Sequence, residues 1–203
     1  LTRTKGFVEG AVAEQVMAYI LYFARRVDLQ SADMHDHSWN SRLMPGAKNR
    51  TLGLIGFGGI GTEVAKRAVP FGMKVIYFCR HPNPADDAAY GVQSVSMEEL
   101  LKESDYVVAA VPLTDQTFHL FNEECIAQMK AGSVLINIAR GPVVDEEALA
   151  QALASGHLGG CAVDVFPKEP CTDSVLTRYS NALLTPHSAT STAENSKATN
   201  FAA

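Results

Sequence analysis

The chain alternates short apolar runs with amphipathic segments along most of its length. Such runs, bounded by polar residues or glycine, are typical of strands buried on both faces of a parallel sheet. The predicted strands are Thr51–Ile55, Lys74–Phe78, Tyr106–Val111, Ser133–Ile138, Cys161–Val165 and Ala182–Leu184. Because helical segments separate them, right-handed crossovers predict an α/β domain built on a doubly wound parallel sheet.

Segments with apolar residues at helical spacing lie before and between these strands. The predicted helices are Glu9–Arg26, Ile60–Phe71, one opened by Ser96 and Glu99 as a capping box, one from Asn122 to Met129, and Asp145–Ser155 with Gly156 at its end. Residues 27–50 lose the periodicity and gather polar residues, so we predict a connector there.

Composition and charge narrow the class of protein. The 203 residues are 47% hydrophobic and 19% charged, which is ordinary for a globular domain. The net charge of -5 argues against nucleic acid as the main partner, and no apolar run approaches the ~20 residues that span a membrane. The four cysteines lack metal-ligand spacing, so we predict free thiols, no metal and a cytoplasmic location. Because Leu1 is not a methionine, we expect residues before it, and organelle targeting stays open.

A glycine-rich turn joins the first predicted strand to its helix. Its residues are Gly56, Gly58, Gly59, Ile60 and Gly61, in the pattern G-x-G-x-x-G. In such turns the first glycine permits a tight bend, the second admits a pyrophosphate and the third lets helix and strand pack closely. Free amides at the helix start then bind the phosphates. The turn predicts a Rossmann fold that binds a dinucleotide, and the alternative is a turn without a ligand.

Three residues after the second predicted strand bear on the choice of cofactor: Cys79, Arg80 and His81. An NAD site normally has Asp or Glu there to bind the ribose hydroxyls, and Cys79 occupies that position. Arg80 can pair with a 2′-phosphate and stack on adenine. We therefore favour NADP(H). NAD(H) is the alternative if Arg80 is solvated and backbone groups hold the ribose.

Polar residues with catalytic potential follow the last three predicted strands, namely Arg140, then Asp164 with Glu169, then His187. The carboxyl ends of parallel strands meet at the edge where open α/β sheets bind ligands. Arg140 can grip a carboxylate and polarise a carbonyl, and His187 can donate a proton, with Glu169 favouring its protonated form. The alternatives are structural: an ion pair for Arg140, a solvated turn charge for Glu169, a loop histidine for His187 and a cap for Asp164.

Together these motifs resemble the D-isomer-specific 2-hydroxyacid dehydrogenase family. The resemblance runs from about Val12 to about Ser196 and includes TLGLIGFGGIG, VPLTDQT, MKAGSVLINIARGPVVDEEAL, GCAVDVFPKEP and LLTPHSA. It implies hydride transfer between a nicotinamide cofactor and a small 2-keto or D-2-hydroxy acid such as glyoxylate or hydroxypyruvate. The alternatives are an NAD-dependent D-hydroxyacid dehydrogenase and a dinucleotide-sensing corepressor or scaffold.

The resemblance also implies a role for each site residue. Arg140 would hold the substrate carboxylate and carbonyl, His187 would be the acid/base with Glu169 as its partner, and Asp164 would meet the nicotinamide end of the cofactor. The other implied cofactor contacts are Val111, Pro112 and Thr117 on the adenine and phosphate side, Ile138 and Ala139 at the nicotinamide ribose, and Ala189 together with Arg140 and His187.

The resemblance further implies that the chain is mainly one of two domains. We expect a connecting helix over residues 1–27, a dinucleotide-binding domain over 28–187 and the start of a return to a missing substrate domain over 188–203. Half of the substrate pocket would then be absent, so we expect dinucleotide binding with slow or no turnover. The family pairs through this domain, which implies a homodimer, with Glu14–Phe23 and Trp39 as candidate contacts.

Overall fold

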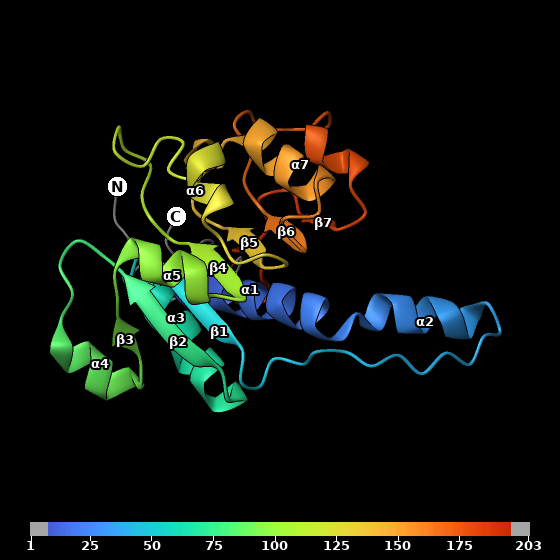
Figure 1. Cartoon of the computed structure of the whole chain (residues 1–203), viewed down its shortest axis with the longest axis horizontal. Coiled ribbons are helices and arrows are strands. Elements are labelled where there is room, and N and C mark those ends of the chain that lie inside the picture. Colours follow the sequence, from blue (N-terminus) through green and yellow to red (C-terminus); the bar gives the residue numbers. More distant parts are fainter. Residues whose placement is uncertain (1–7, 196–203) are drawn as a thin grey trace.

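The computed structural model describes residues 8–195, in which seven parallel strands form one sheet (Figure 1). The strands are β1 Thr51–Ile55, β2 Lys74–Phe78, β3 Gln93–Ser94, β4 Tyr106–Ala109, β5 Val134–Asn137, β6 Gly160–Val163 and β7 Ala182–Leu184. Their order is β3-β2-β1-β4-β5-β6-β7, so the direction of winding reverses between β1 and β4. The predicted doubly wound sheet is confirmed, and the reversal marks the usual ligand-binding point of such sheets.

Helices cover both faces of this sheet. One face packs against α1 (Val8–Arg25) and α3 (Gly59–Ala68), and the other against α5 (Met97–Glu103), α6 (Glu123–Ala127) and α7 (Glu146–Ala154). Successive strand residues alternate between the faces, as Leu54 lies in the first core cluster and Ile55 in the second. None of the helices within residues 8–195 is long and apolar enough to cross a membrane.

Side-chain caps fix where several helices begin. Ser96 Oγ accepts a hydrogen bond from the Glu99 amide at 3.1 Å, and Asn122 Oδ1 accepts one from the Cys125 amide at 2.9 Å. Asp145 Oδ1 accepts from two amides in the first turn of α7. Each cap satisfies amides that have no partner within the helix, and each confirms a predicted helix start.

The predicted connector over residues 27–50 is partly wrong, because Val27–His35 forms a helix, α2. Arg26 separates α1 from α2 through a left-handed backbone with φ 41°. No residue of α2 is buried, so its sequence has no apolar stripe to reveal it. Residues 27–46, which we call the arm, project from the body and return where the Gly46 amide donates to the Ala24 carbonyl (Figure 1).

Other differences from the predicted elements are small. Four short elements were not predicted: α4 (Pro84–Tyr90), β3, and 3-10 turns over Gly141–Val143 and Val175–Arg178. The predicted helix 60–71 divides into α3 and a 3-10 turn over Val69–Phe71. The strands predicted over 106–111, 133–138 and 161–165 begin or end one or two residues away. The predicted segments 1–27 and 188–203 are described only in part, because residues 1–7 and 196–203 lie outside the described residues.

Candidate active site

The glycine loop joins the carboxyl end of β1 to α3 at the point where the winding reverses. Gly56 has φ +99°, and its amide donates to the Phe78 carbonyl of β2 at 2.9 Å. A Cβ on Gly61 would lie 2.6 Å from the Gly56 oxygen, whereas one on Gly58 would meet no atom within 4 Å. In α3 itself, Gly58 provides no side-chain cap and the first turn has no acidic residue. Turns of this kind bind phosphates through their amides.

Aromatic packing holds the glycine loop against β2. The Phe57 ring stacks on Tyr77 with centroids 4.1 Å apart. The buried Tyr77 hydroxyl donates to Asp87 Oδ1 at 2.8 Å, and burial together with this hydrogen bond raises the pKa of Tyr77 to about 12. Asp87 also accepts a bond from the Ser94 amide at 3.4 Å. Its carboxylate is thus committed to β2 and β3.

The three residues after β2 lie beside this loop, because β1 and β2 are neighbours in the sheet. Cys79 is half-buried, while Arg80 and His81 are exposed. None of the ion pairs between described residues involves Arg80. An unpaired guanidinium at this edge can bind an anionic group.

The predicted catalytic residues meet beyond the carboxyl ends of β5, β6 and β7. His187 Nδ1 lies 2.6 Å from Glu169 Oε2, and Glu169 Oε1 accepts a hydrogen bond from the Phe166 amide at 2.9 Å. The bond with His187 lowers the pKa of Glu169 most, and the Phe166 amide and the charge of Arg140 lower it further. Glu169 is therefore an ionised partner that orients the imidazole. The arrangement leaves Nε2 as the nitrogen that can exchange a proton with a ligand.

A buried asparagine shapes the loop that carries Arg140. Asn137 Oδ1 accepts a hydrogen bond from the Ala139 amide at 3.1 Å, and its Nδ2 donates to the Arg140 carbonyl at 3.1 Å. The exposed Arg140 side chain donates through Nη1 to the Ala139 carbonyl at 2.7 Å, while Ile138 and Ala139 are buried. Sequence reasoning missed Asn137. A polar residue inside the apolar run SVLINI was the signal that could have found it.

Gly141 brings the arginine loop against the glutamate loop. A Cβ on Gly141 would lie 2.0 Å from the carbonyl carbon of Phe166 and 2.2 Å from its oxygen. Backbone contact this close excludes any side chain at Gly141. Because the Phe166 amide also binds Glu169, this contact links the positions of Arg140 and Glu169.

Asp164 lies under the histidine loop with only 1% of its surface exposed. Its Oδ1 accepts hydrogen bonds from the Thr185 hydroxyl and the Ser188 amide, and its Oδ2 accepts one from the Ala189 amide at 3.0 Å. These bonds fit the structural alternative, a cap of the turn. That Asp164 contacts the nicotinamide, and that the buried Ala189 contacts the cofactor, stay predictions.

The loop after β4 reaches the glycine loop. Val111 Cγ1 lies close to Gly56, since a Cβ built there would be 3.1 Å away. Thr117 Oγ1 donates to the Pro112 carbonyl at 2.6 Å and accepts from the Thr114 amide at 2.8 Å, which fixes the loop. The predicted adenine-side residues therefore neighbour the predicted phosphate site. Among residues 8–195, no group of three or more His, Cys, Asp or Glu side chains is placed to hold a metal ion.

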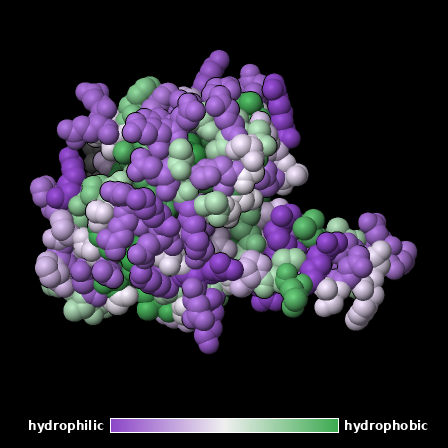
Figure 2. All heavy atoms as spheres, viewed as in Figure 1, coloured by the Kyte–Doolittle hydropathy of each residue, from purple (hydrophilic) through white to green (hydrophobic). Residues whose placement is uncertain are grey.

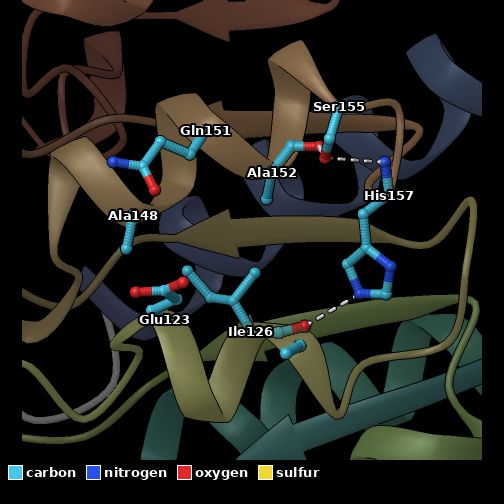
Figure 3. Close-up of a pocket in the computed structure, with 8 residues that line it drawn as sticks. Glu123, Ile126, Ala148, Gln151, Ala152, Ser155 and His157 are labelled. Atoms are coloured by element: carbon cyan, nitrogen blue, oxygen red, sulfur yellow. Dashed lines mark hydrogen bonds between the residues drawn. The ribbon is translucent and has the colours of Figure 1, made fainter.

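A separate hollow of about 310 Å³ lies between α6 and α7 (Figure 3). His157 closes one end, where its Nε2 lies 3.0 Å from the Ile126 carbonyl oxygen. None of the predicted site residues lines the hollow, whose lining residues are Glu123, Ile126, Ala127, Ala148, Gln151, Ala152, Ser155 and His157. The hollow is thus distinct from the candidate active site.

The match to a known family agrees with this geometry. A family profile described as "D-isomer specific 2-hydroxyacid dehydrogenase, NAD binding domain" matches residues 17–189, which is most of the chain. The chain belongs to this dehydrogenase family. The matched range contains the glycine loop and all three predicted catalytic residues.

Relatives of this dehydrogenase chain extend the match. It is 39% identical to a glyoxylate reductase of Thermococcus litoralis, over 96% of this chain and 61% of the relative. It is 41% identical to a hydroxypyruvate reductase of Thermotoga maritima, over 94% and 63%. The structure of the TT0316 protein from Thermus thermophilus is similar, with TM-score 0.85 and 40% identity, over 96% and 62%. The chain spans about three fifths of the length of these relatives.

Proposed function

We propose that this chain supplies the cofactor site and the catalytic residues of an oxidoreductase. The enzyme transfers a hydride between a nicotinamide cofactor, with NADPH favoured, and a small 2-keto or D-2-hydroxy acid such as glyoxylate or hydroxypyruvate. The observation that carries the proposal is the contact of His187 with Glu169 near Arg140, at the same sheet edge as the glycine loop. The names of the relatives agree with this substrate class.

Each residue of the set has a role in reducing a keto acid. Arg140 binds the substrate carboxylate as a fork and polarises the neighbouring carbonyl. The nicotinamide, when bound, supplies the hydride for the carbonyl carbon. His187 gives the proton from Nε2 to the carbonyl oxygen, and Glu169 keeps the ring oriented and stabilises its positive charge. In the oxidation direction, His187 takes the proton back from the hydroxyl.

The function is tested by separating binding from turnover. Fluorescence titration of the 203-residue chain with NADPH and NADH is expected to show binding of both, tighter for NADPH, with slow or no reduction of keto acids. A chimera, in which residues 8–195 replace the matching part of the Thermococcus litoralis reductase, is expected to reduce glyoxylate or hydroxypyruvate. Tight dinucleotide binding without turnover in the chimera would favour a sensor or scaffold instead.

Arg80 is the residue on which the preference for NADPH depends. Arg80→Ala is expected to weaken NADPH binding about ten- to hundredfold and NADH binding little, because a hydrogen bond to a charged group contributes about 1.5–3 kcal/mol. Titration with both cofactors measures the difference. Arg42→Ala is the matched control, since it removes an arginine of the arm that pairs with Asp33. Equal weakening of both cofactors by Arg80→Ala would contradict the phosphate contact.

The arm is the proposed contact in a homodimer. Apolar residues of α1 such as Val16, Tyr19 and Ile20 are buried within this chain, which leaves the arm as the stronger candidate. Its exposed apolar side chains are Val27, Leu29, Met34, Trp39 and Leu43. Figure 2 shows green and white patches among the purple surface of the projection. A monomer gains nothing from exposing so many apolar groups on one projection, whereas a second copy can cover them.

Leu43→Asp is expected to convert the dimer to a monomer while leaving the thermal stability of the body unchanged. Leu43 is fully exposed, so the substitution breaks no packing within the chain. Sedimentation velocity measures the change in mass. Phe71→Asp alters an exposed apolar residue outside the arm and is expected to leave the dimer intact. A dimer that persists in Leu43→Asp would place the contact elsewhere.

The cysteines support the proposed reducing, cytoplasmic location. All four are free, and burial raises the pKa of Cys161 to about 12 and that of Cys125 to about 11. Thiols with such pKa values stay protonated and unreactive. Microscopy of a tagged copy in its host cell tests the location.

A further inference from the structure

The backbone of the histidine loop is held in a conformation that histidine does not favour. His187 has φ +49°, in the left-handed region, which costs a residue with a side chain about 1–2 kcal/mol. The loop therefore needs bonds that over-determine it. The His187 amide donates to the Asp164 carbonyl oxygen at 2.7 Å and to the Thr185 carbonyl oxygen at 3.0 Å.

We propose that Asp164 is a positioning residue that sets where His187 stands relative to Glu169. This inference rests on the proposed function, in which His187 is the acid/base. The Asp164 carboxylate binds the chain on both sides of His187, through the Thr185 hydroxyl before it and the amides of Ser188 and Ala189 after it. Together with its carbonyl, which accepts from the His187 amide, Asp164 thus spans the whole loop from Thr185 to Ala189.

A buried tyrosine extends this network to α1. The hydroxyl oxygens of Tyr19 and Thr185 lie 2.5 Å apart, and Tyr19 is 1% exposed. Thr185 donates its single hydroxyl proton to Asp164 Oδ1, so Tyr19 must donate to Thr185. Burial raises the pKa of Tyr19, which keeps that donor protonated. The direction of donation is therefore fixed along the whole network.

The two partners of the catalytic contact lie on different loops. Glu169 lies on the loop after β6, where the Phe166 amide fixes it, and His187 lies on the loop after β7, which Asp164 holds from the loop after β6. The 2.6 Å separation between Glu169 Oε2 and His187 Nδ1 therefore depends on Asp164, although the bonds of the Asp164 carboxylate go to Thr185, Ser188 and Ala189 and not to either side chain. The pKa of Glu169, which the bond with His187 lowers, reports on this separation.

Asp164→Asn tests the proposal in the 203-residue chain without cofactor. Whichever way the amide is placed, its NH₂ faces the amide of either Ser188 or Ala189, and one bond is lost. The pKa of Glu169, followed by carboxyl ¹³C NMR and assigned with Glu169→Gln, is expected to rise towards its ordinary range. Hydrogen exchange at whichever of the Ser188 and Ala189 amides loses its bond is expected to accelerate about tenfold or more, because a bond to a charged group contributes about 1.5–3 kcal/mol.

Thr185→Val gives a second, milder test that preserves the shape of the side chain. It removes the hydroxyl that joins Tyr19 to Asp164 and is expected to raise the pKa of Glu169 less than Asp164→Asn does, while Thr185→Ser restores the native value. Thr177→Val is the control, because the Thr177 hydroxyl donates to the Ser174 carbonyl oxygen outside this network. If Asp164→Asn does not fold, the pKa of Glu169 in Thr185→Val decides whether the proposal holds.

A folded Asp164→Asn or Thr185→Val chain with an unchanged pKa of Glu169 would overturn the proposal. That is also the result expected if Asp164 served only as a nicotinamide contact, since no cofactor is present. The measurement needs neither turnover nor dinucleotide. A chimera without turnover would therefore sink the proposed function alone, and an unresponsive Glu169 would sink the positioning role alone.

Discussion

His187→Ala in the chimera is expected to lower turnover about 10²–10⁴-fold, the contribution of general acid–base catalysis by a positioned side chain. Glu169 holds the imidazole through Nδ1, so the loss removes the only proton that the proposed mechanism delivers. Dinucleotide affinity is expected to stay nearly unchanged. Steady-state rates together with cofactor titration measure both quantities, and a large fall in cofactor affinity would show that His187 serves the cofactor site instead.

Glu169→Gln is the matched control for the histidine. It keeps the shape of the side chain and removes its charge, so a smaller fall in turnover is expected than for His187→Ala. Because His187 lowers the pKa of Glu169, the carboxylate stays ionised at pH values where an isolated glutamate begins to protonate. The stabilisation from the Glu169–His187 ion pair is therefore present above the ordinary pKa range of a glutamate. It is lost as the pH falls through the lowered pKa of Glu169. Turnover of the wild-type chimera is expected to fall at low pH as Glu169 becomes protonated, and turnover of the Glu169→Gln chimera is expected to lack this fall.

Most of the fold could be predicted from the sequence because burial leaves a periodic signal. The three strands over 51–55, 74–78 and 182–184 match residue for residue, since polar residues or glycine bound each apolar run. The helix α2 could not be predicted in this way. None of its residues is buried, and a helix without a buried face has no apolar stripe in its sequence.

The candidate site, like the fold, could be predicted only in part. Convergence of Arg140, Glu169 and His187 could be predicted, because strand topology alone sends the ends of β5, β6 and β7 to one edge. The residues that hold these three side chains in place could not be predicted in this way. Asn137 and Asp164 act through hydrogen bonds to backbone atoms, and those bonds depend on how loops distant in sequence lie together. Sequence spacing does not contain that information, so sequence reasoning passed over Asn137 and gave the structural role of Asp164 only as an alternative, a cap.

Gly141→Ala is expected to reduce the free energy of unfolding by about 3 kcal/mol or more, at the upper end of the cost of overpacking. The added Cβ would lie 2.0 Å from the carbonyl carbon of Phe166, and neither backbone can rotate away as a side chain could. The two loops must separate, which moves Arg140 away from Glu169. Displacement of about 1 Å in a catalytic group can cost about a hundredfold in rate, so turnover of the chimera is expected to fall by a similar factor. Denaturant unfolding and steady-state rates measure the two effects.

Gly58→Ala is the matched control, because the same added methyl group meets no protein atom within 4 Å and the backbone has no positive φ. Its unfolding free energy is expected to stay within about 0.5 kcal/mol of the native value. Its dinucleotide affinity is expected to fall, since the methyl group occupies the space over the backbone that a pyrophosphate needs. Gly141→Ala thus damages the fold and the arrangement of the catalytic residues, whereas Gly58→Ala damages the cofactor site in an intact fold. A Gly141→Ala chain as stable as the native one would mean that the two loops are not in the contact that joins Arg140 to Glu169.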